Sequence, residues 1–202
     1  MAEGNYRIGV LAVQGDFAEH IAALNELETV EAEPVKTPEQ IESCEALVIP
    51  GGESTTIGKL CDRFELDAAI GTLHETKKPI WGTCAGLILL AKNIVGSKQW
   101  RLGYMDIEVE RNAFGRQVDS FEADIEIAGW NGGTARGVFI RAPYVTRVEE
   151  TVQILSKYDD RIVMVRQGHL LGSAFHPELT EDRRVQQYFV EMIEESRNVA
   201  TQ

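Results

Sequence analysis

The chain has few cysteines and no pattern that would tie them together. Its 202 residues contain three, Cys44, Cys61 and Cys84, an odd number at wide spacing and without a C-x-x-C pair. A disulfide framework needs paired cysteines and a structural zinc site needs closely spaced ligands, so neither is expected. The N-terminus is polar and shows no signal peptide. We therefore expect a reducing, cytoplasmic compartment.

Other absences narrow the class further. No apolar run approaches the ~20 residues that a membrane helix needs, and no Pro/Ser-rich linker, repeat or low-complexity segment divides the chain. Lys and Arg number 20 against 32 Asp and Glu, a formal net charge of −12. Nucleic-acid affinity comes mainly from basic side chains that neutralise phosphates, so no nucleic-acid partner is expected. One domain over residues 1–202 is the simplest organisation.

What the chain does contain, in its first half, is a repeated strand-then-helix pattern. Apolar runs typical of buried strands lie at 7–13, 46–49 and 79–81, a short second strand is expected around 31–35, and helical segments follow these strands. Thr37 to Gln40 (T-P-E-Q) has the form of a capping box. A helix is expected from Cys84 to about Lys92. Alternation of this kind predicts a parallel sheet with helices on both faces.

The rhythm changes from Leu102 onward. Short β-rich stretches separated by turn signals lie near 104–110, 118–127, 136–141, 152–157, 161–166 and 170–175, and a last helix spans Glu181 to about Arg197. The predicted fold class is α/β: an open, mostly parallel, flavodoxin-like sheet flanked by helices, with an antiparallel extension packed against it. Ligands of such sheets bind beyond the carboxyl ends of the strands.

One segment at that edge, G-T-C-A-G (Gly82 to Gly86), has the form of a nucleophile elbow with Cys84 in place of serine. The strand-to-helix bend brings backbone atoms too close for a Cβ, which explains the glycines. The start of the helix favours a thiolate. On residue type alone a buried structural cysteine is the better interpretation, but the glycines and the strand-before, helix-after context favour a nucleophile.

A thiolate nucleophile needs a base and a group that orients it. Near the end of the chain, S-A-F-H-P-E supplies His176 and Glu178. In an extended segment residues i and i+2 point to the same side, so Glu178 is expected to reach the ring of His176. Pro177 disfavours a helical conformation at His176. The competing interpretation is a strand-end histidine before a helix cap.

The loop P-G-G-E-S-T, Pro50 to Thr55, follows the strand at 46–49. A tetrahedral oxyanion needs backbone N–H donors. The amide of Ala85 is one candidate, and Gly51 or Gly52 could supply another. The alternative is an ordinary turn in which Ser54 or Thr55 caps the next helix. The loop is not a phosphate-binding P-loop, because the G-K-[ST] ending is absent.

Other residues are weaker candidates. His20 and His74 fall on expected helices and His169 in a hairpin turn, so all three are interpreted as structural or surface residues. Cys44 and Cys61 are expected to pack in the core. The stretch G-W-N-G-G, residues 129–133, is interpreted as a hairpin turn.

These motifs together resemble the class I, or triad, glutamine amidotransferases. Within that class, L-A-V-Q-G-D, P-G-G-E-S-T-T, W-G-T-C-A-G and A-F-H-P-E are most similar to the glutaminase subunits of pyridoxal 5′-phosphate synthases. The similarity runs from about residue 6 to 195. P-G-G-E-S-T together with G-T-C-A-G is a specific combination, whereas H-P-E alone marks only the wider class.

The resemblance implies a role for each matching residue. Cys84 would form a glutamyl thioester, His176 would protonate the departing ammonia and then activate water, and Glu178 would orient His176. The glutamine contacts implied by the resemblance are Gly52, Glu53, Ser54, Arg111, Ile140 and Arg141. Gln14 falls beside the active site and the partner interface. No metal and no cofactor are implied.

The resemblance also implies a partner, a separate (β/α)₈ synthase chain in a large hetero-oligomer. Ammonia would pass to it through a tunnel, and pyridoxal 5′-phosphate would be the product. The family's glutaminase is largely idle until this partner docks. Three alternatives stay open: the glutaminase of another amidotransferase, such as imidazole glycerol phosphate synthase; an elbow-cysteine hydrolase or chaperone of the flavodoxin-like group; and a non-catalytic binding subunit.

Overall fold

A computed structural model of the chain describes residues 5–112, 120–130 and 133–200. Its centre is a block of five parallel strands: β1 (Tyr6–Leu11), β2 (Val30–Val35), β3 (Ala46–Ile49), β4 (Ile80–Thr83) and β12 (Leu170–Ser173). They lie in the order β2-β1-β3-β4-β12. All residues of β3, β4 and β12 are buried, which agrees with their predominantly apolar sequences.

The other strands of this ten-stranded sheet extend it beyond β12. They are β5 (Ala91–Ile94), β6 (Met105–Glu110), β9 (Tyr144–Val148), β10 (Gln153–Tyr158) and β11 (Arg161–Gln167). The order continues as β11-β9-β6-β5, and β10 pairs with β11. Two strands lie apart from it, β7 (Ser120–Ile125) and β8 (Ala135–Ile140), which form an antiparallel hairpin.

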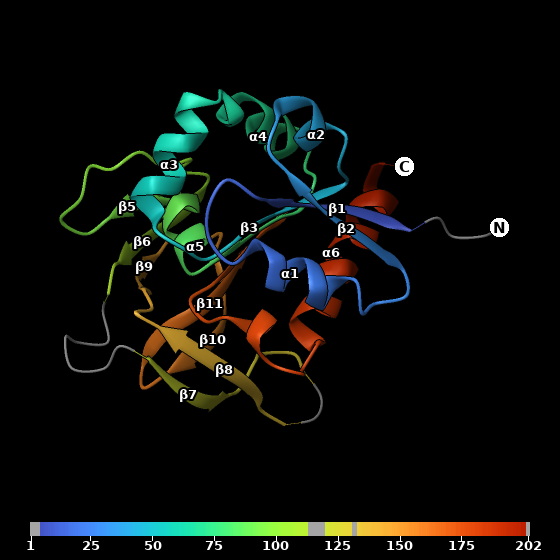
Figure 1. The fold of residues 1–202 in the computed structure, drawn as a ribbon. Helices are drawn as coiled ribbons and strands as arrows, with labels where there is room; N and C mark the ends of the chain where they lie inside the picture. The colour runs from blue at the N-terminus through green and yellow to red at the C-terminus, as the bar shows by residue number, and fades with distance from the viewer. Residues whose placement is uncertain (1–4, 113–119, 131–132, 201–202) are drawn as a thin grey trace.

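The helices are α1 (Phe17–Leu24), α2 (Pro38–Glu42), α3 (Ser54–Arg63), α4 (Leu66–Glu75), α5 (Ala85–Leu90) and α6 (Arg184–Ala200). Figure 1 shows α2, α3 and α4 on one face of the parallel strands and α1 and α6 on the other. Trp81 marks the second face, because its ring packs on His20 of α1 and Phe189 of α6 at centroid distances of 5.5 and 5.4 Å. Among the described residues, no helix is both long and apolar enough to cross a membrane.

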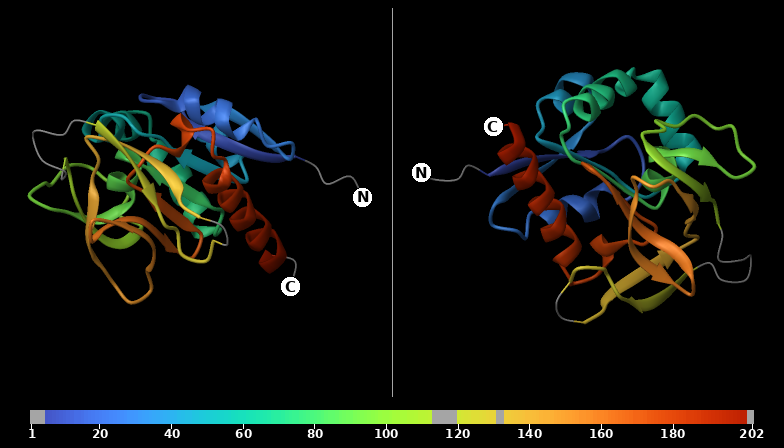
Figure 2. Two further views of the ribbon diagram at one scale, coloured as in Figure 1. Left: turned by 90° about the horizontal axis from the view of Figure 1, so that it is seen from below. Right: turned by 180° about the vertical axis from the view of Figure 1, so that it is seen from behind.

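The start of β1 and the end of α6 meet at the amino edge of the sheet. The guanidinium of Arg197 lies 4.2 Å from the centroid of the Tyr6 ring, and the Tyr6 hydroxyl donates a hydrogen bond to Glu194. The right view of Figure 2 shows the end of α6 close to the start of the first strand. The two described ends of the chain are therefore neighbours.

Most elements agree with the sequence pattern, including the capping box at Thr37, which is formed in full. The helix expected to reach Lys92 is wrong at its end. It stops at Leu90, and residues 91–94 form β5, with Ala91 and Ile94 buried and the two residues between them exposed. A short apolar run fits either structure, and pairing with β6 decides in favour of a strand.

The antiparallel extension expected after Leu102 is confirmed. It continues the same sheet, because β11 pairs antiparallel with β12. The stretch expected at 170–175 is itself parallel to β4. β9 was not predicted. The hairpin expected around residues 129–133 joins β7 to β8, although residues 131–132 lie outside the described part of the chain.

Candidate active site

Cys84 lies on a sharp bend between β4 and α5. Its backbone has φ 47° and ψ −98°, a conformation that residues other than glycine rarely adopt. A Cβ on Gly82 would lie 2.5 Å from the Gly86 carbonyl, and one on Gly86 would lie 2.0 Å from the Ile49 carbonyl oxygen. Both glycines are therefore required by close backbone approach, as the sequence predicted.

We expect Gly86→Ala to destabilise the protein by about 1–3 kcal/mol or more, because its Cβ would meet backbone that cannot easily move. Gly71→Ala is the matched control. Gly71 lies inside α4, and the nearest atom to an added Cβ there is the Tyr104 hydroxyl at 3.4 Å. That change should stabilise by roughly 0.5–1 kcal/mol through helix propensity. Urea unfolding of both variants checks the pair, and equal stabilities would contradict the proposed crowding at the elbow.

His176 and Glu178 meet Cys84 at the same edge of the sheet, because β12 and β4 are neighbours. The His176 amide donates to the Val138 carbonyl of β8 at 2.8 Å, and Nδ1 of His176 lies 2.7 Å from Glu178 Oε1. Both side chains are almost fully buried. The expected His–Glu contact is therefore present.

The local geometry of this pair differs from expectation. Glu178 does not follow His176 in extended chain; it lies in a short 3₁₀ turn, Pro177–Leu179. Pro177 starts the turn, since its fixed φ suits the first helical position. His176 itself stays non-helical at φ −108° and ψ 84°. The tight turn, rather than strand alternation, carries the Glu178 carboxylate back to the imidazole.

A second carboxylate reaches the same imidazole nitrogen. Oδ2 of Asp16, from the loop between β1 and α1, lies 2.9 Å from His176 Nδ1. Burial alone would lower the pKa of His176, but its contacts with Asp16, Cys84 and Glu178 raise it overall. Burial raises the pKa of Glu178, whereas the hydrogen bond and charge of His176 hold the pKa of Asp16 below its usual range despite burial. The arrangement favours an imidazolium.

The Gly51–Gly52 loop lies directly against this cluster. A Cβ on Gly51 would lie 2.5 Å from Cε1 of His176. The Gly51 carbonyl accepts from the Asp16 amide at 3.3 Å, and Gln14 Oε1 accepts from the Glu53 amide at 2.8 Å. The loop's position is thus set by the neighbouring loop after β1.

The helix cap in this loop is neither Ser54 nor Thr55. Glu53 occupies the N-cap position of α3, and its carboxylate accepts from the Thr56 amide at 2.8 Å. The longer glutamate side chain can fold back over the first turn from outside the helix, which leaves Ser54 and Thr55 inside it. The loop can therefore cap α3 and form part of the site at the same time.

These segments enclose a cavity of about 340 Å³. Its lining brings together nine residues singled out from the sequence: Gln14, Gly52, Glu53, Ser54, Cys84, Arg111, Ile140, Arg141 and His176. Asp16, Ile88 and Asn112 complete it. Gly51, Ala85 and Glu178 are not among the lining residues; they lie directly beside Gly52, Cys84 and His176, respectively, in the chain or in space. The cavity is of a size to hold a small amino acid.

The polar wall of the cavity contains charges of both signs. Arg111 pairs with Glu53 Oε1 at 3.2 Å and donates to Gln99 Oε1 at 2.7 Å. Gln99 in turn donates to Ser54 Oγ at 3.0 Å. The Ile140 carbonyl, which also lines the cavity, lies 4.0 Å from Cys84 Sγ. A ligand with an ammonium and a carboxylate at one end and a neutral, reactive end would match this distribution.

Asp16 and Gln99 are not among the residues predicted from the sequence to form the site. Asp16 follows Gln14-Gly15 in a loop already expected at the catalytic edge, and this could have marked it. His20 was assigned to a structural or surface role; it is fully buried, and its Nε2 lies 2.9 Å from Thr83 Oγ1 and 3.4 Å from Glu178 Oε2. Burial lowers the pKa of His20 to about 3, so it is neutral. No local signal identified Gln99.

The remaining candidates are structural. Cys44 and Cys61 are buried free thiols, as expected, and burial raises the pKa of Cys61 to about 12. His74 and His169 form a pair, with Nδ1 of the former 2.9 Å from Nε2 of the latter. They lie on the other edge of the sheet from Cys84, since His169 immediately precedes β12.

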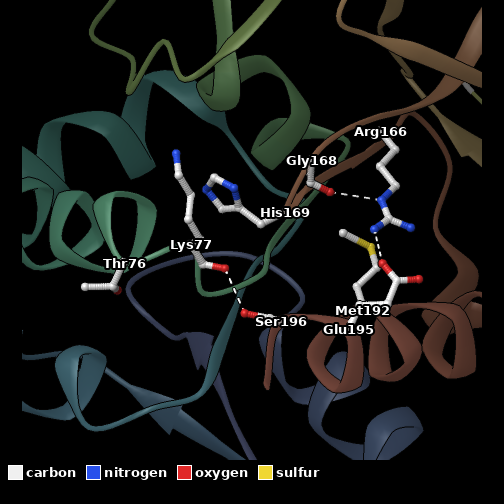
Figure 3. A pocket seen from close by; sticks show the side chains of 8 residues that line it. All are labelled: Thr76, Lys77, Arg166, Gly168, His169, Met192, Glu195 and Ser196. Atoms are coloured by element: carbon white, nitrogen blue, oxygen red, sulfur yellow. Dashed lines mark hydrogen bonds and ion pairs between the residues drawn. The ribbon is translucent and has the colours of Figure 1, made fainter. Parts of the chain in front are cut away.

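A second hollow, of about 410 Å³, lies beside His169 and is shown in Figure 3. Residues at the end of α4, at the β11–β12 turn and on α6 line it. Its polar groups are engaged with one another: Arg166 pairs with Glu195 and donates to the Gly168 carbonyl, and Ser196 donates to the Lys77 carbonyl. Cys84 and His176 do not line this second hollow; they line the first cavity.

Comparisons with known proteins agree with this geometry. The model of the SNO glutamine amidotransferase family matches residues 10–195. The pyridoxal 5′-phosphate synthase subunit PdxT of Moorella thermoacetica is 54% identical over 93% of this chain and 99% of its own length, and that of Brevibacillus brevis is 52% identical over 95% and 100%. A solved structure described as a glutamine amidotransferase is 51% identical, with a TM-score of 0.88 over 93% of this chain and 98% of that one.

Proposed function

Because this chain belongs to the SNO glutamine amidotransferase family, we propose that it is the glutaminase subunit of a pyridoxal 5′-phosphate synthase. The reaction is hydrolysis of L-glutamine to glutamate and ammonia. The observation that carries this proposal is the meeting of Cys84, His176 and Glu178 beside one cavity at the carboxyl edge of the sheet. The near full-length relatives that are named as subunits of this synthase support the choice of complex.

In the proposed reaction, the Cys84 thiolate attacks the side-chain amide carbon of glutamine. His176 gives its proton to the amide nitrogen, so that the C–N bond breaks and ammonia departs. A glutamyl thioester remains on Cys84. The imidazole then takes a proton from water, which attacks the thioester. Glutamate departs, and the thiol is regenerated. Glu178 holds the His176 ring through Nδ1.

Stabilisation of the oxyanion is assigned to backbone amides. The Ala85 amide, directly after the nucleophile, is one proposed donor, and the Gly51–Gly52 segment supplies the other. The contact of Gly51 with the His176 ring supports this assignment, because it places the loop against the reacting groups. A change in this loop on partner binding would then switch catalysis.

Glutamine itself is proposed to lie along the charged wall. Arg111 or Arg141 would bind the α-carboxylate, and Glu53 would bind the α-ammonium. Gly52, Ser54 and Ile140 would contact the substrate through backbone or short side-chain groups. Their shared place in the cavity lining supports this assignment. Gln14, which holds the Glu53 amide, would lie between the substrate and the partner.

The proposed partner is a (β/α)₈ synthase chain in a large hetero-oligomer in the cytoplasm, to which ammonia is channelled. Pyridoxal 5′-phosphate is then the product of the complex, and this chain uses no cofactor. The whole of residues 1–202 is proposed to act as one glutamine amidotransferase domain.

The test is ammonia release from glutamine by the purified chain, alone and with a pyridoxal 5′-phosphate synthase subunit. We expect at least a tenfold stimulation by that subunit. Unchanged activity would point to a glutaminase with another acceptor, and stimulation by an imidazole glycerol phosphate synthase partner instead would reassign the complex. No ammonia release under any of these conditions would favour a non-catalytic subunit.

A further inference from the structure

The proposed catalytic histidine faces two carboxylates rather than one. Asp16 and Glu178 approach the same nitrogen, His176 Nδ1, at 2.9 and 2.7 Å, and Asp16 lies 160 residues before His176 in the chain. One ligating atom from each of the three side chains lies within 4.8 Å of the others. We propose that Asp16 is a positioning residue of the catalytic centre, which shares with Glu178 the orientation and charge balance of His176. This inference rests on the proposed function.

The ordinary role for an aspartate at this position would be a helix cap. Asp16 occupies the N-cap position of α1, where its residue type is strongly preferred for bonding to the first helical amides. Its side chain makes no such bond. The carboxylate turns toward His176 instead, while its backbone amide holds the Gly51 carbonyl. The residue therefore contributes its charge to the site and not to the helix.

The two carboxylates occupy different environments. The Glu178 side chain is fully buried, whereas that of Asp16 is 22% exposed and lines the cavity. Burial and the neighbouring Asp16 both raise the pKa of Glu178, while the pKa of Asp16 is lowered, chiefly by His176 acting against burial. Of the two carboxylates that can supply negative charge to the ring, Asp16 is thus the one that faces the cavity.

Other groups that face His176 do not offer this charge. His20 of α1 is buried and neutral, and Cys84 of the β4–α5 turn is the proposed nucleophile. The Gly51 loop presents backbone only. When Cys84 passes its proton to His176, the imidazolium is therefore balanced by Asp16 and Glu178. Either carboxylate alone can accept the hydrogen bond from Nδ1. When both are removed, the ring has no anionic partner at that nitrogen.

A double-mutant cycle tests this sharing. Ammonia release is measured, with the synthase subunit present, for the wild type, Asp16→Asn, Glu178→Gln and the double variant. Glu19→Gln is the matched control, since it removes one negative charge from an exposed position on α1. We expect each single change at the site to cost about tenfold in kcat/KM and the double change to cost at least tenfold more than the product of the two. The control should be unaffected.

A second readout separates positioning from structure. The ring nitrogens of His176, followed by NMR, should show a lower fraction of imidazolium at alkaline pH in Asp16→Asn than in Glu19→Gln, because removal of a nearby negative charge disfavours the charged ring. Losses that simply multiply in the cycle, or an Asp16→Asn chain that loses its native fold, would overturn the proposal. A wild-type chain that releases no ammonia would overturn the proposed function as well, and with it this inference.

Discussion

Cys84→Ala is expected to remove glutamine hydrolysis, with a loss of about 10⁴-fold or more, because no other group in the proposed mechanism can form the thioester. The fold should survive. Alanine keeps the Cβ and the backbone geometry at φ 47° and removes only a sulfur that lines the cavity. Ammonia release with the synthase subunit and urea unfolding of the same variant measure the two effects separately.

Cys61→Ala is the matched control for this prediction. Cys61 lies in α3, is 1% exposed and belongs to the hydrophobic core. Its truncation should lower the free energy of unfolding by about 1 kcal/mol and leave hydrolysis unchanged. Truncation of Cys84 is thus expected to remove activity and preserve stability, whereas truncation of Cys61 should lower stability and preserve activity. Substantial activity in Cys84→Ala, measured with the partner, would exclude the thioester route.

His176→Asn is expected to be nearly as damaging, with a loss of about 10³–10⁴-fold in kcat, because it removes the group that moves protons in both halves of the reaction. Glu178→Gln should cost less, about tenfold. The difference follows from the second carboxylate: Asp16 still lies 2.9 Å from Nδ1 when the charge of Glu178 is gone.

The comparison is made at saturating glutamine with the synthase subunit present, so that kcat is read directly. Circular dichroism of both variants controls for folding, since Glu178 is fully buried. Equal losses in the two variants would contradict the division of roles between proton transfer and orientation.

The sequence revealed the catalytic edge because local rules dominate there. Continuous buried strands, the glycines around Cys84 and Pro177 beside His176 each restrict the backbone within a few residues, so their positions follow from short-range sterics. The strand–helix alternation also predicted a parallel sheet, although the order of its strands came only from the structure. Family resemblance then connected these loops to one chemistry.

What the sequence did not reveal depends on contacts between distant segments. Asp16 reaches His176 across 160 residues, and neither residue carries a local mark of the other. Residues 91–94 form a strand because β6 is available beside them, although their own sequence fits the end of a helix equally well. Long-range pairing of this kind overrides local pattern, and only the folded chain shows which partner is present.

The closeness of Tyr6 and Arg197 has a practical consequence for handling the protein. The described ends lie together at the amino edge of the sheet, whereas Cys84 lies beyond the carboxyl edge of β4. An affinity tag, a fluorophore or a surface tether attached through either end therefore leaves the mouth of the cavity unobstructed. The same closeness suits a circular permutant, in which a short linker joins the ends and new ends open in an exposed loop. Immobilised chain can thus be probed for partner docking with the catalytic edge facing solution.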